Sequence, residues 1–267
     1  MSPGESRTLE VAVHGGALAV EYAGAGTPLV LLHGWALDRR AWQPQMALAD
    51  RFRLLAIDRR GFGQSSAPPD LDREMADLAA VRDALKLDRI VLVGMSQGGR
   101  IALHFALGHP ERVAALVLQG SPLDGFRPAP QGEDAIPIAD FVKLARAGCL
   151  DGMKALWREH ALMRALTPTA RQLIDAMLAD YEGRDLLAAA RHELDPIADR
   201  LAEIQVPCLV VTGEEDTGWR QLVGDALARG LPNARREVIA GAGHLCNLSH
   251  PVEFNILLTE FIARLPS

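Results

Sequence analysis

Ser96 stands at the centre of a Gly-x-Ser-x-Gly pattern, between an apolar run and a segment with a helical pattern. A serine hydroxyl is a useful nucleophile only when the fold exposes it and a base takes its proton. A sharp strand-to-helix turn would expose Ser96, and Gly94 and Gly98 would allow close backbone approach. The same turn would place the backbone N–H of Gln97 at a helix N-terminus, where it could stabilise an oxyanion. The pattern predicts attack by Ser96 on an acyl carbon, although ordinary strand-to-helix turns also contain it.

His244 is the candidate general base. It follows the glycine-rich residues 241–243, directly after the last expected strand. A histidine in a loop is often only structural, but the order Ser96, Asp216, His244 along the chain favours a catalytic role. In that role His244 would deprotonate Ser96 during attack, protonate the leaving group and then activate water for hydrolysis of an acyl-enzyme.

Three acidic residues in a row, Glu214 to Asp216, follow an expected strand at residues 208–211. A carboxylate at the carboxyl end of a late strand can orient an imidazole and balance its charge. The spacing from the strand favours Asp216 as this acid and predicts that Glu214 and Glu215 are solvated. Asp124 follows another expected strand and remains an alternative, because an acid can also be supplied from that strand end.

A loop at residues 33–35, His-Gly-Trp, directly follows a short apolar run. We expect the backbone N–H of Trp35 to be the second oxyanion donor, and the imidazole of His33 to be structural. Loss of one such donor can cost about 2.7–4 kcal/mol of transition-state stabilisation. The glycine-containing stretch 58–65 has no obvious reacting group and is predicted to be a structural turn beneath the site.

Strand and helix patterns alternate along most of the chain, which predicts an α/β fold with a mostly parallel sheet covered by helices on both faces. Residues 9–13 and 17–22 are expected to form an opening hairpin. The further expected strands are residues 28–32, 53–57, 90–93, 113–118, 208–211 and 235–239. The expected helices between and after them are residues 40–49, 74–85, 97–107, 219–229 and 252–265.

This alternation fails between about residues 121 and 203, where loop signals precede a series of helical patterns without strands. The expected helices there are residues 138–147, 152–164, 168–181 and 184–191. An all-helical segment within such a series predicts an inserted helical cap, or lid, over residues 122–203. Residues 1–121 and 204–267 would then form the core.

Composition excludes several classes of protein. The chain has 267 residues, a net charge of −6 and no basic run, which argues against nucleic acid or an anionic membrane as a partner. Three widely spaced cysteines, Cys149, Cys208 and Cys246, favour a reducing compartment over a disulfide framework or zinc site. Cys246 is expected to be a small apolar filler. With neither a secretory signal nor an apolar run long enough to span a bilayer, we expect a soluble cytoplasmic protein without metal or cofactor.

Candidate substrate-binding residues come from the turn around Ser96 and from the expected cap. Met95 precedes the nucleophile, and Met153 and Trp157 belong to an apolar set at near-helical spacing that includes Leu156 and Met163. Such sets most often form the packing face of a helix. We therefore expect only one or two of these side chains to face the pocket.

The chain resembles the α/β-hydrolase fold superfamily over residues 9–265. Within it, the similarity is greatest to small capped esterases, enol-lactonases and cofactor-free haloperoxidases. Residues 33–35 and 58–66 (Asp-Arg-Arg-Gly-Phe-Gly-Gln-Ser-Ser) are similar to the haloperoxidases, whereas residues 94–102 and 244–251 are more similar to the enol-lactonases. The resemblance implies these roles for matched residues: Ser96 nucleophile, Asp216 acid, His244 base, and Trp35 and Gln97 backbone donors. Haloalkane dehalogenases and epoxide hydrolases of this fold carry Asp at the nucleophile position, so Ser96 argues against their chemistry.

The predicted function is that of a serine hydrolase acting on a small carboxylic ester or lactone. The alternatives are a cofactor-free perhydrolase or haloperoxidase, in which hydrogen peroxide attacks the acyl-enzyme, and a hydrolase of C–C bonds in diketones. A non-catalytic ligand receptor is a further alternative because this fold also serves as a binding module. A pure receptor would have no need for all three of Ser96, Asp216 and His244.

Overall fold

One eight-stranded sheet organises the molecule in the computed structural model, which describes residues 6–128, 132–188 and 193–265. The strand order is β1-β2-β4-β3-β5-β6-β7-β8. β1 pairs antiparallel with β2 and β2 antiparallel with β4, whereas all other neighbours are parallel. The strands are β1 Arg7–Val13, β2 Gly16–Ala23, β3 Pro28–Leu32, β4 Arg53–Ile57, β5 Ile90–Met95, β6 Val113–Gln119, β7 Cys208–Gly213 and β8 Ala234–Ile239. The mostly parallel α/β sheet predicted from the sequence is confirmed.

The central strands are apolar throughout because both faces of the sheet are buried. Leu29 and Leu31 of β3 pack into one core cluster, and Val30 and Leu32 into the other. The first cluster includes side chains of η1 (Arg39–Asp50) and α9 (Pro251–Ile262), which cover one face of the sheet. The second includes side chains of α1 (Glu74–Ala84), α2 (Gln97–Gly108) and α7 (Gly218–Gly230), which cover the other.

Three predicted helices differ in form from the observed ones. Residues 39–50 form 3₁₀ turns, because Pro44 lies inside the segment and has no N–H to donate to an α-helical bond. The helix predicted over residues 152–164 is α4 (Leu150–Arg158), followed by the separate short turn η5 (Ala161–Met163). The C-terminal helix α9 ends at Ile262, earlier than predicted, and the short helix α8 (Cys246–Ser249) precedes it.

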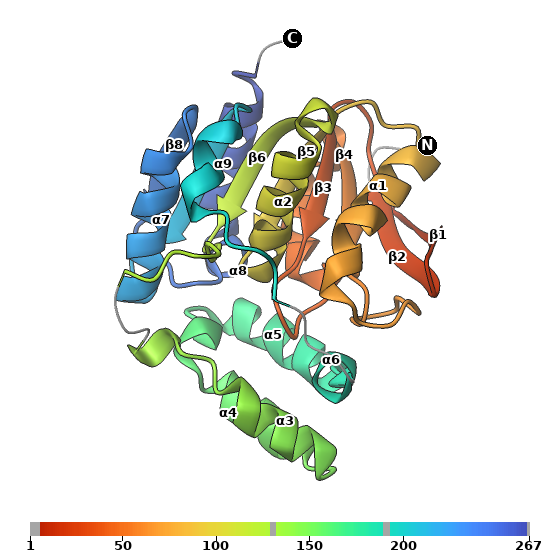
Figure 1. Cartoon of the computed structure of the whole chain (residues 1–267), viewed down its shortest axis with the longest axis vertical. Coiled ribbons are helices and arrows are strands. Elements are labelled where there is room, and N and C mark those ends of the chain that lie inside the picture. Colours follow the sequence, from red (N-terminus) through yellow and green to blue (C-terminus); the bar gives the residue numbers. More distant parts are fainter. Residues whose placement is uncertain (1–5, 129–131, 189–192, 266–267) are drawn as a thin grey trace.

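The segment between β6 and β7 contributes helices and no strand among its described residues. It contains η4 (Gly132–Asp134), α3 (Ile138–Arg146), α4, η5, α5 (Pro168–Asp180), α6 (Arg184–Leu187) and η6 (Ala198–Glu203). Figure 1 shows α3 to α6 gathered beyond one end of the sheet, apart from the helices that cover its faces. Residues 189–192, which include the predicted end of the fourth helix, lie outside the described residues.

Candidate active site

Ser96 lies at a strained turn between β5 and α2. Its φ is +50° and its ψ is −118°, a backbone conformation that side chains other than glycine rarely adopt. The Ser96 N–H donates to Gln119 O at 2.7 Å, which fixes the turn against the end of β6. The side chain is half-buried and lines two cavities. The chain therefore adopts the predicted strand-to-helix turn, with a Ser96 side chain that is half-buried and lines these cavities.

Glycines keep this turn tight because their neighbours leave no room for a Cβ. A Cβ on Gly94 would lie 2.5 Å from Gly98 O, and one on Gly98 would overlap Leu32 O at the end of β3. A Cβ on Gly34 would lie 3.4 Å from the Ser96 Cβ. The loop after β3 and the turn after β5 are thus packed backbone against backbone.

The two predicted oxyanion donors lie on either side of Ser96. Gln97 begins α2, so its N–H belongs to the first turn, where backbone donors have no partner within the helix. Trp35 follows Gly34, the residue that packs against Ser96. Trp35, Gln97 and Ser96 line the same cavity, which has a volume of about 490 Å³. The backbone arrangement is compatible with an oxyanion site between them.

Buried hydrogen bonds define the tautomer of His33. Its Nδ1 donates to Gly34 O at 2.7 Å, and its Nε2 accepts the Arg59 N–H at 3.0 Å. A carbonyl can only accept and an amide N–H can only donate, so the ring is neutral with its proton on Nδ1. Burial, assisted by the nearby Arg59 guanidinium, lowers the pKa of His33 to about 3. The imidazole has a structural role, as the sequence indicated.

Arg59 connects this loop to the turn after β5, a role that sequence reasoning missed. Its Nη1 donates to His33 O at 3.1 Å and to Gln97 Oε1 at 2.9 Å. Its Nε and Nη2 donate to the two carboxylate oxygens of Glu74, at 2.7 and 2.5 Å. The stretch 58–65 is a turn, as predicted, but Arg59 also connects the segments that carry Trp35 and Gln97. A buried guanidinium needs a carboxylate partner, and the available sequence signal was a pair of arginines just after the apolar strand at residues 53–57.

Asp216 and His244 are in direct contact. His244 Nδ1 lies 2.9 Å from Asp216 Oδ2, while Asp216 Oδ1 accepts the Thr217 N–H at 2.8 Å. When Nδ1 carries the proton and donates it in a hydrogen bond to the carboxylate, the neutral ring presents Nε2 as an acceptor. This Nε2 is buried and has no hydrogen-bond partner among the described residues. His244 and Ser96 line the same small cavity, of about 20 Å³, which is space for about one water molecule.

The alternative acid, Asp124, lies in a different set of contacts. Its Oδ2 accepts Arg100 Nε at 2.7 Å and is 2.8 Å from His104 Nε2. These bonds hold the carboxylate against α2, so it is Asp216 that meets His244. Glu214 and Glu215 are exposed, in line with the prediction that they are solvated.

A buried amide network holds the loop that carries His244, and sequence reasoning missed it. Gln119 Nε2, at the end of β6, donates to His244 O at 3.0 Å and to Asn247 Oδ1 at 2.9 Å. Asn247 Nδ2 donates to Ala41 O at 2.7 Å, and Gln45 Nε2 donates to Asn247 O at 3.1 Å. Gln119, Gln45 and Asn247 are fully buried. A glutamine ending an apolar strand was the one available signal.

The predicted substrate-binding side chains separate into two groups. Met95 and Trp157 line the small cavity beside Ser96 and His244, together with Leu162 and Met163. Met153, in contrast, is fully buried in the core cluster and is not among the residues that line either cavity at Ser96. Its place on α4 points it into the packing between helices. Neither of these two cavities supports its predicted contact with substrate, which stays a prediction.

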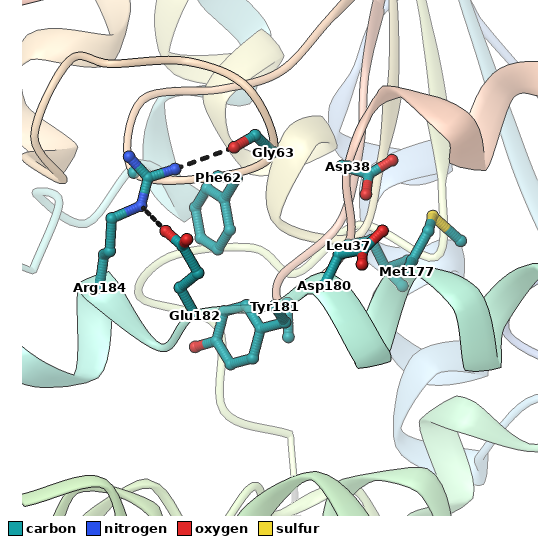
Figure 2. Close-up of a pocket in the computed structure, with 11 residues that line it drawn as sticks. Leu37, Asp38, Phe62, Gly63, Met177, Asp180, Tyr181, Glu182 and Arg184 are labelled. Carbon is teal, nitrogen blue, oxygen red and sulfur yellow. Dashed lines mark hydrogen bonds and ion pairs between the residues drawn. The ribbon is translucent and has the colours of Figure 1, made fainter. Parts of the chain in front are cut away.

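The inserted segment reaches the loop after β3 through Trp35. The indole Nε1 donates to Asp185 Oδ2 at 2.6 Å, and the Tyr181 hydroxyl donates to Asp185 Oδ1 at 2.5 Å. Figure 2 shows the adjacent junction, where Arg184 extends to Gly63 O and to the Glu182 carboxylate. These contacts hold the insertion against the sheet domain beside the site.

Other candidate groups show no sign of chemistry. Burial and the neighbouring Asp216 raise the pKa of the Cys246 thiol, so it is protonated and inert, as expected of a filler. Within the described residues, no three His, Cys, Asp or Glu side chains are grouped as a metal site would require. The described helices include none with the length and apolar character needed to cross a bilayer.

Comparison with known proteins defines the class. The profile of the alpha/beta hydrolase fold family matches residues 27–251, and the chain belongs to this family. It is 31% identical to the 2-hydroxy-6-oxononadienedioate/2-hydroxy-6-oxononatrienedioate hydrolase of Burkholderia vietnamiensis, over 97% of this chain and 96% of that protein.

Solved structures extend the comparison. Est816, described as an N-acyl homoserine lactone degrading enzyme, is 30% identical with a TM-score of 0.78, covering 95% of this chain and 100% of that one. A thermophilic esterase from Thermogutta terrifontis is 28% identical with a TM-score of 0.80, covering 97% and 98%. Further relatives bear the names of haloperoxidases and an enol-lactonase, the groups that the sequence motifs resemble.

Proposed function

We propose that this chain is a serine hydrolase that cleaves small carboxylic esters or lactones through an acyl-enzyme. The observation that carries the proposal is the state of His244. Its Nδ1 is held by Asp216, and its buried Nε2 lies unpaired in the wall of the cavity that Ser96 also lines. An unpaired buried acceptor costs free energy, which suits a site whose partner arrives during the reaction.

In the proposed mechanism, Ser96 Oγ attacks the carbonyl carbon as His244 Nε2 takes the hydroxyl proton. The negative charge on the carbonyl oxygen is stabilised by the N–H groups of Trp35 and Gln97. His244 then gives its proton to the leaving oxygen, which departs as an alcohol. In the second half, His244 Nε2 removes a proton from water as the water oxygen attacks the acyl carbon. The bond to Ser96 Oγ then breaks, His244 returns the proton to Oγ, and the carboxylic acid is released.

The two cavities at Ser96 suggest an asymmetric substrate. The cavity of about 20 Å³ is apolar apart from Ser96 and His244, whereas the cavity of about 490 Å³ contains several charged side chains. We propose that one substituent of the scissile group is small and the other is larger and partly polar. Residues 122–203 would act as the cap that closes both spaces.

Hydrolysis of p-nitrophenyl esters from acetate to octanoate, with wild type beside Ser96→Ala, tests the proposal. We expect turnover that favours short acyl chains and disappears in the variant. Equal turnover in Ser96→Ala would remove Ser96 from the mechanism. Folded wild type that turns over neither esters nor lactones, yet binds a ligand measurably, would replace the hydrolase with a receptor.

A second candidate is hydrolysis of a C–C bond. The compound named for the Burkholderia vietnamiensis relative is an oxo, hydroxy dicarboxylate without an ester, so its hydrolysis must break a bond between carbons. The charged lining of the larger cavity would suit such a polar substrate. Loss of the dienol absorbance of such a compound, with ester turnover absent, would favour this function.

The perhydrolase alternative uses the same acyl-enzyme, with hydrogen peroxide in place of water, and gives a peracid. Haloperoxidase relatives and the similarity of residues 33–35 and 58–66 favour testing it. Bromination that depends on both peroxide and acetate, at a rate comparable with ester hydrolysis, would support it. Bromination far slower than hydrolysis would make it a side reaction.

A further inference from the structure

A buried aspartate of the insertion contacts the loop that carries Asp216. Asp134 belongs to η4, and its Oδ1 accepts the Thr217 hydroxyl at 2.7 Å and Arg220 Nε at 3.0 Å. Its side chain is fully buried, and that of Arg220 is 5% exposed. Asp134 is not among the residues that line either cavity at Ser96. Asp134 therefore lies outside both cavities and can influence Asp216 and His244 only through Thr217 and Arg220.

The first connection is through Thr217. The Thr217 N–H donates to Asp216 Oδ1 at 2.8 Å, the oxygen that does not contact His244. At the start of α7 the Thr217 hydroxyl accepts the backbone N–H of Arg220 at 3.3 Å and donates to Asp134 Oδ1. The hydrogen bonds of the Thr217 hydroxyl fix the position of Thr217, and with it the position of the Thr217 backbone N–H. Asp134 thereby fixes the donor that orients the Asp216 carboxylate.

The second connection is through Arg220 and Gly120. Arg220 Nη1 donates to Gly120 O at 3.3 Å. A Cβ on Gly120 would lie 2.6 Å from His244 Cε1 and 3.4 Å from Asp216 Oδ2, so this glycine is the surface on which both side chains rest. The pairing of Arg220 with Asp134 holds the guanidinium in the position that supports Gly120.

We infer that Asp134 and Arg220 are positioning residues that hold the Asp216–His244 pair in its reactive geometry, so that the insertion completes the acid–base half of the site. The inference rests on the proposed function. A group that aligns catalytic side chains affects the rate of the chemical step, because small misplacements are costly there. A group that only attaches the insertion would affect stability.

Thr217 and Asp134 provide the test. We expect Asp134→Asn and Thr217→Val each to lower kcat for the best p-nitrophenyl ester about 10- to 100-fold, with KM changed less than about threefold. Thr217→Ser keeps the hydroxyl and should retain kcat close to wild type. Asp77→Asn, which breaks the buried pair with Arg60 away from Asp216, is the control: it should lower Tm but not kcat. The rate at which a fluorophosphonate labels Ser96 should fall in parallel with kcat.

Wild-type kcat and labelling rate in Asp134→Asn, with only Tm lowered, would overturn the inference. If Asp134→Asn does not fold, Thr217→Val and Thr217→Ser decide, and equal kcat in the two would overturn it. A wild-type chain that neither cleaves esters nor reacts with the fluorophosphonate would overturn the proposed function itself, and this inference with it. Reactive wild type with unaffected variants would overturn the inference alone.

Discussion

The two halves of the candidate site are held by different kinds of force. Around Ser96, backbone packs on backbone: Gly94 and Gly98 have no space for a side chain, and Ser96 itself takes a positive φ. Around His244, polar side chains from separate segments converge. Gln119 donates a hydrogen bond to the backbone carbonyl of His244, and Asp216 contacts Nδ1 of its imidazole. One half is determined by steric exclusion and the other by hydrogen bonds.

This difference predicts different responses to mutation. Steric exclusion is short-range and leaves little room for relaxation, so a single added methyl group should disrupt the nucleophile half. A hydrogen-bond network is shared among several partners, so removal of one member should weaken the acid–base half by degrees.

Ser96→Ala and His244→Ala should have the largest effect, because each removes a group that the reaction cannot replace. We expect kcat for p-nitrophenyl acetate to fall by about 10⁴- to 10⁶-fold in each. Circular dichroism and Tm should stay close to wild type, since neither side chain is needed for the core. A double variant no slower than either single variant would show that the two residues act as a unit, whereas additive losses would contradict it.

Asp216→Asn should lower kcat by about 10⁴-fold, because an amide cannot hold the same imidazole tautomer or balance its charge. Asp124→Asn is the matched control, since Asp124 contacts Arg100 and His104 instead of His244. It should change kcat little. The reverse result would identify Asp124 as the acid.

Gly98→Ala tests steric control directly, with Gly108→Ala on the same helix as its control. A Cβ at Gly98 would overlap Leu32 O, whereas a Cβ at Gly108 meets nothing within 4 Å. We expect Gly98→Ala to lower the free energy of unfolding by about 1–3 kcal/mol and kcat by about 10²-fold. Gly108→Ala should be neutral or stabilising by up to about 1 kcal/mol. Urea unfolding and ester kinetics measure both, and equal results would refute the steric argument.

Asn247→Ala tests the network, because Asn247 bridges Gln119, Gln45 and Ala41 O behind His244. Leaving these buried partners unpaired should cost about 1–3 kcal/mol of unfolding free energy, and kcat should fall only about 10-fold. Asn233→Ala, whose exposed amide contacts Gln205 O, is the control and should be near neutral. A fall in kcat as large as that of Asp216→Asn would contradict the expectation that loss of one network member weakens the acid–base half only by degrees.

His33 should affect pH dependence more than rate. Its pKa falls from 6.5 to about 3 on folding, so between these values the unfolded chain binds a proton that the folded chain does not. The contribution of the buried neutral His33 to the free energy of unfolding is then fully present above pH 6.5. This contribution is lost as the pH falls from 6.5 toward 3, by up to about 1.4 kcal/mol per pH unit. His33→Gln should flatten the pH dependence of urea unfolding, with exposed His14→Gln as control. An unchanged slope in His33→Gln would contradict a neutral buried ring.

Much of the fold could be predicted because its signals are local. The apolar runs of β3, β5 and β6 are strands buried on both faces, so each is recognisable in isolation. Where the helices deviated, a single residue or break was responsible, such as Pro44 in η1. Within the insertion, α4 and η5 could not be separated in advance, because both are short and share an apolar pattern.

The local sequence was sufficient to select the candidate catalytic residues: the turn at Ser96, the glycines before His244 and the acidic run ending at Asp216 each mark a strand end. Only the tertiary structure placed Asp216 instead of Asp124 against His244, and left Met153 out of the two cavities at Ser96. It also brought Gln119 and Asp134 against the residues around His244 and Asp216. The physical reason is range. Backbone turns and apolar periodicity depend on neighbours in the chain, whereas a buried hydrogen bond pairs groups that only the completed fold brings together. Asp134 and Thr217, which are 83 positions apart in the sequence, illustrate this.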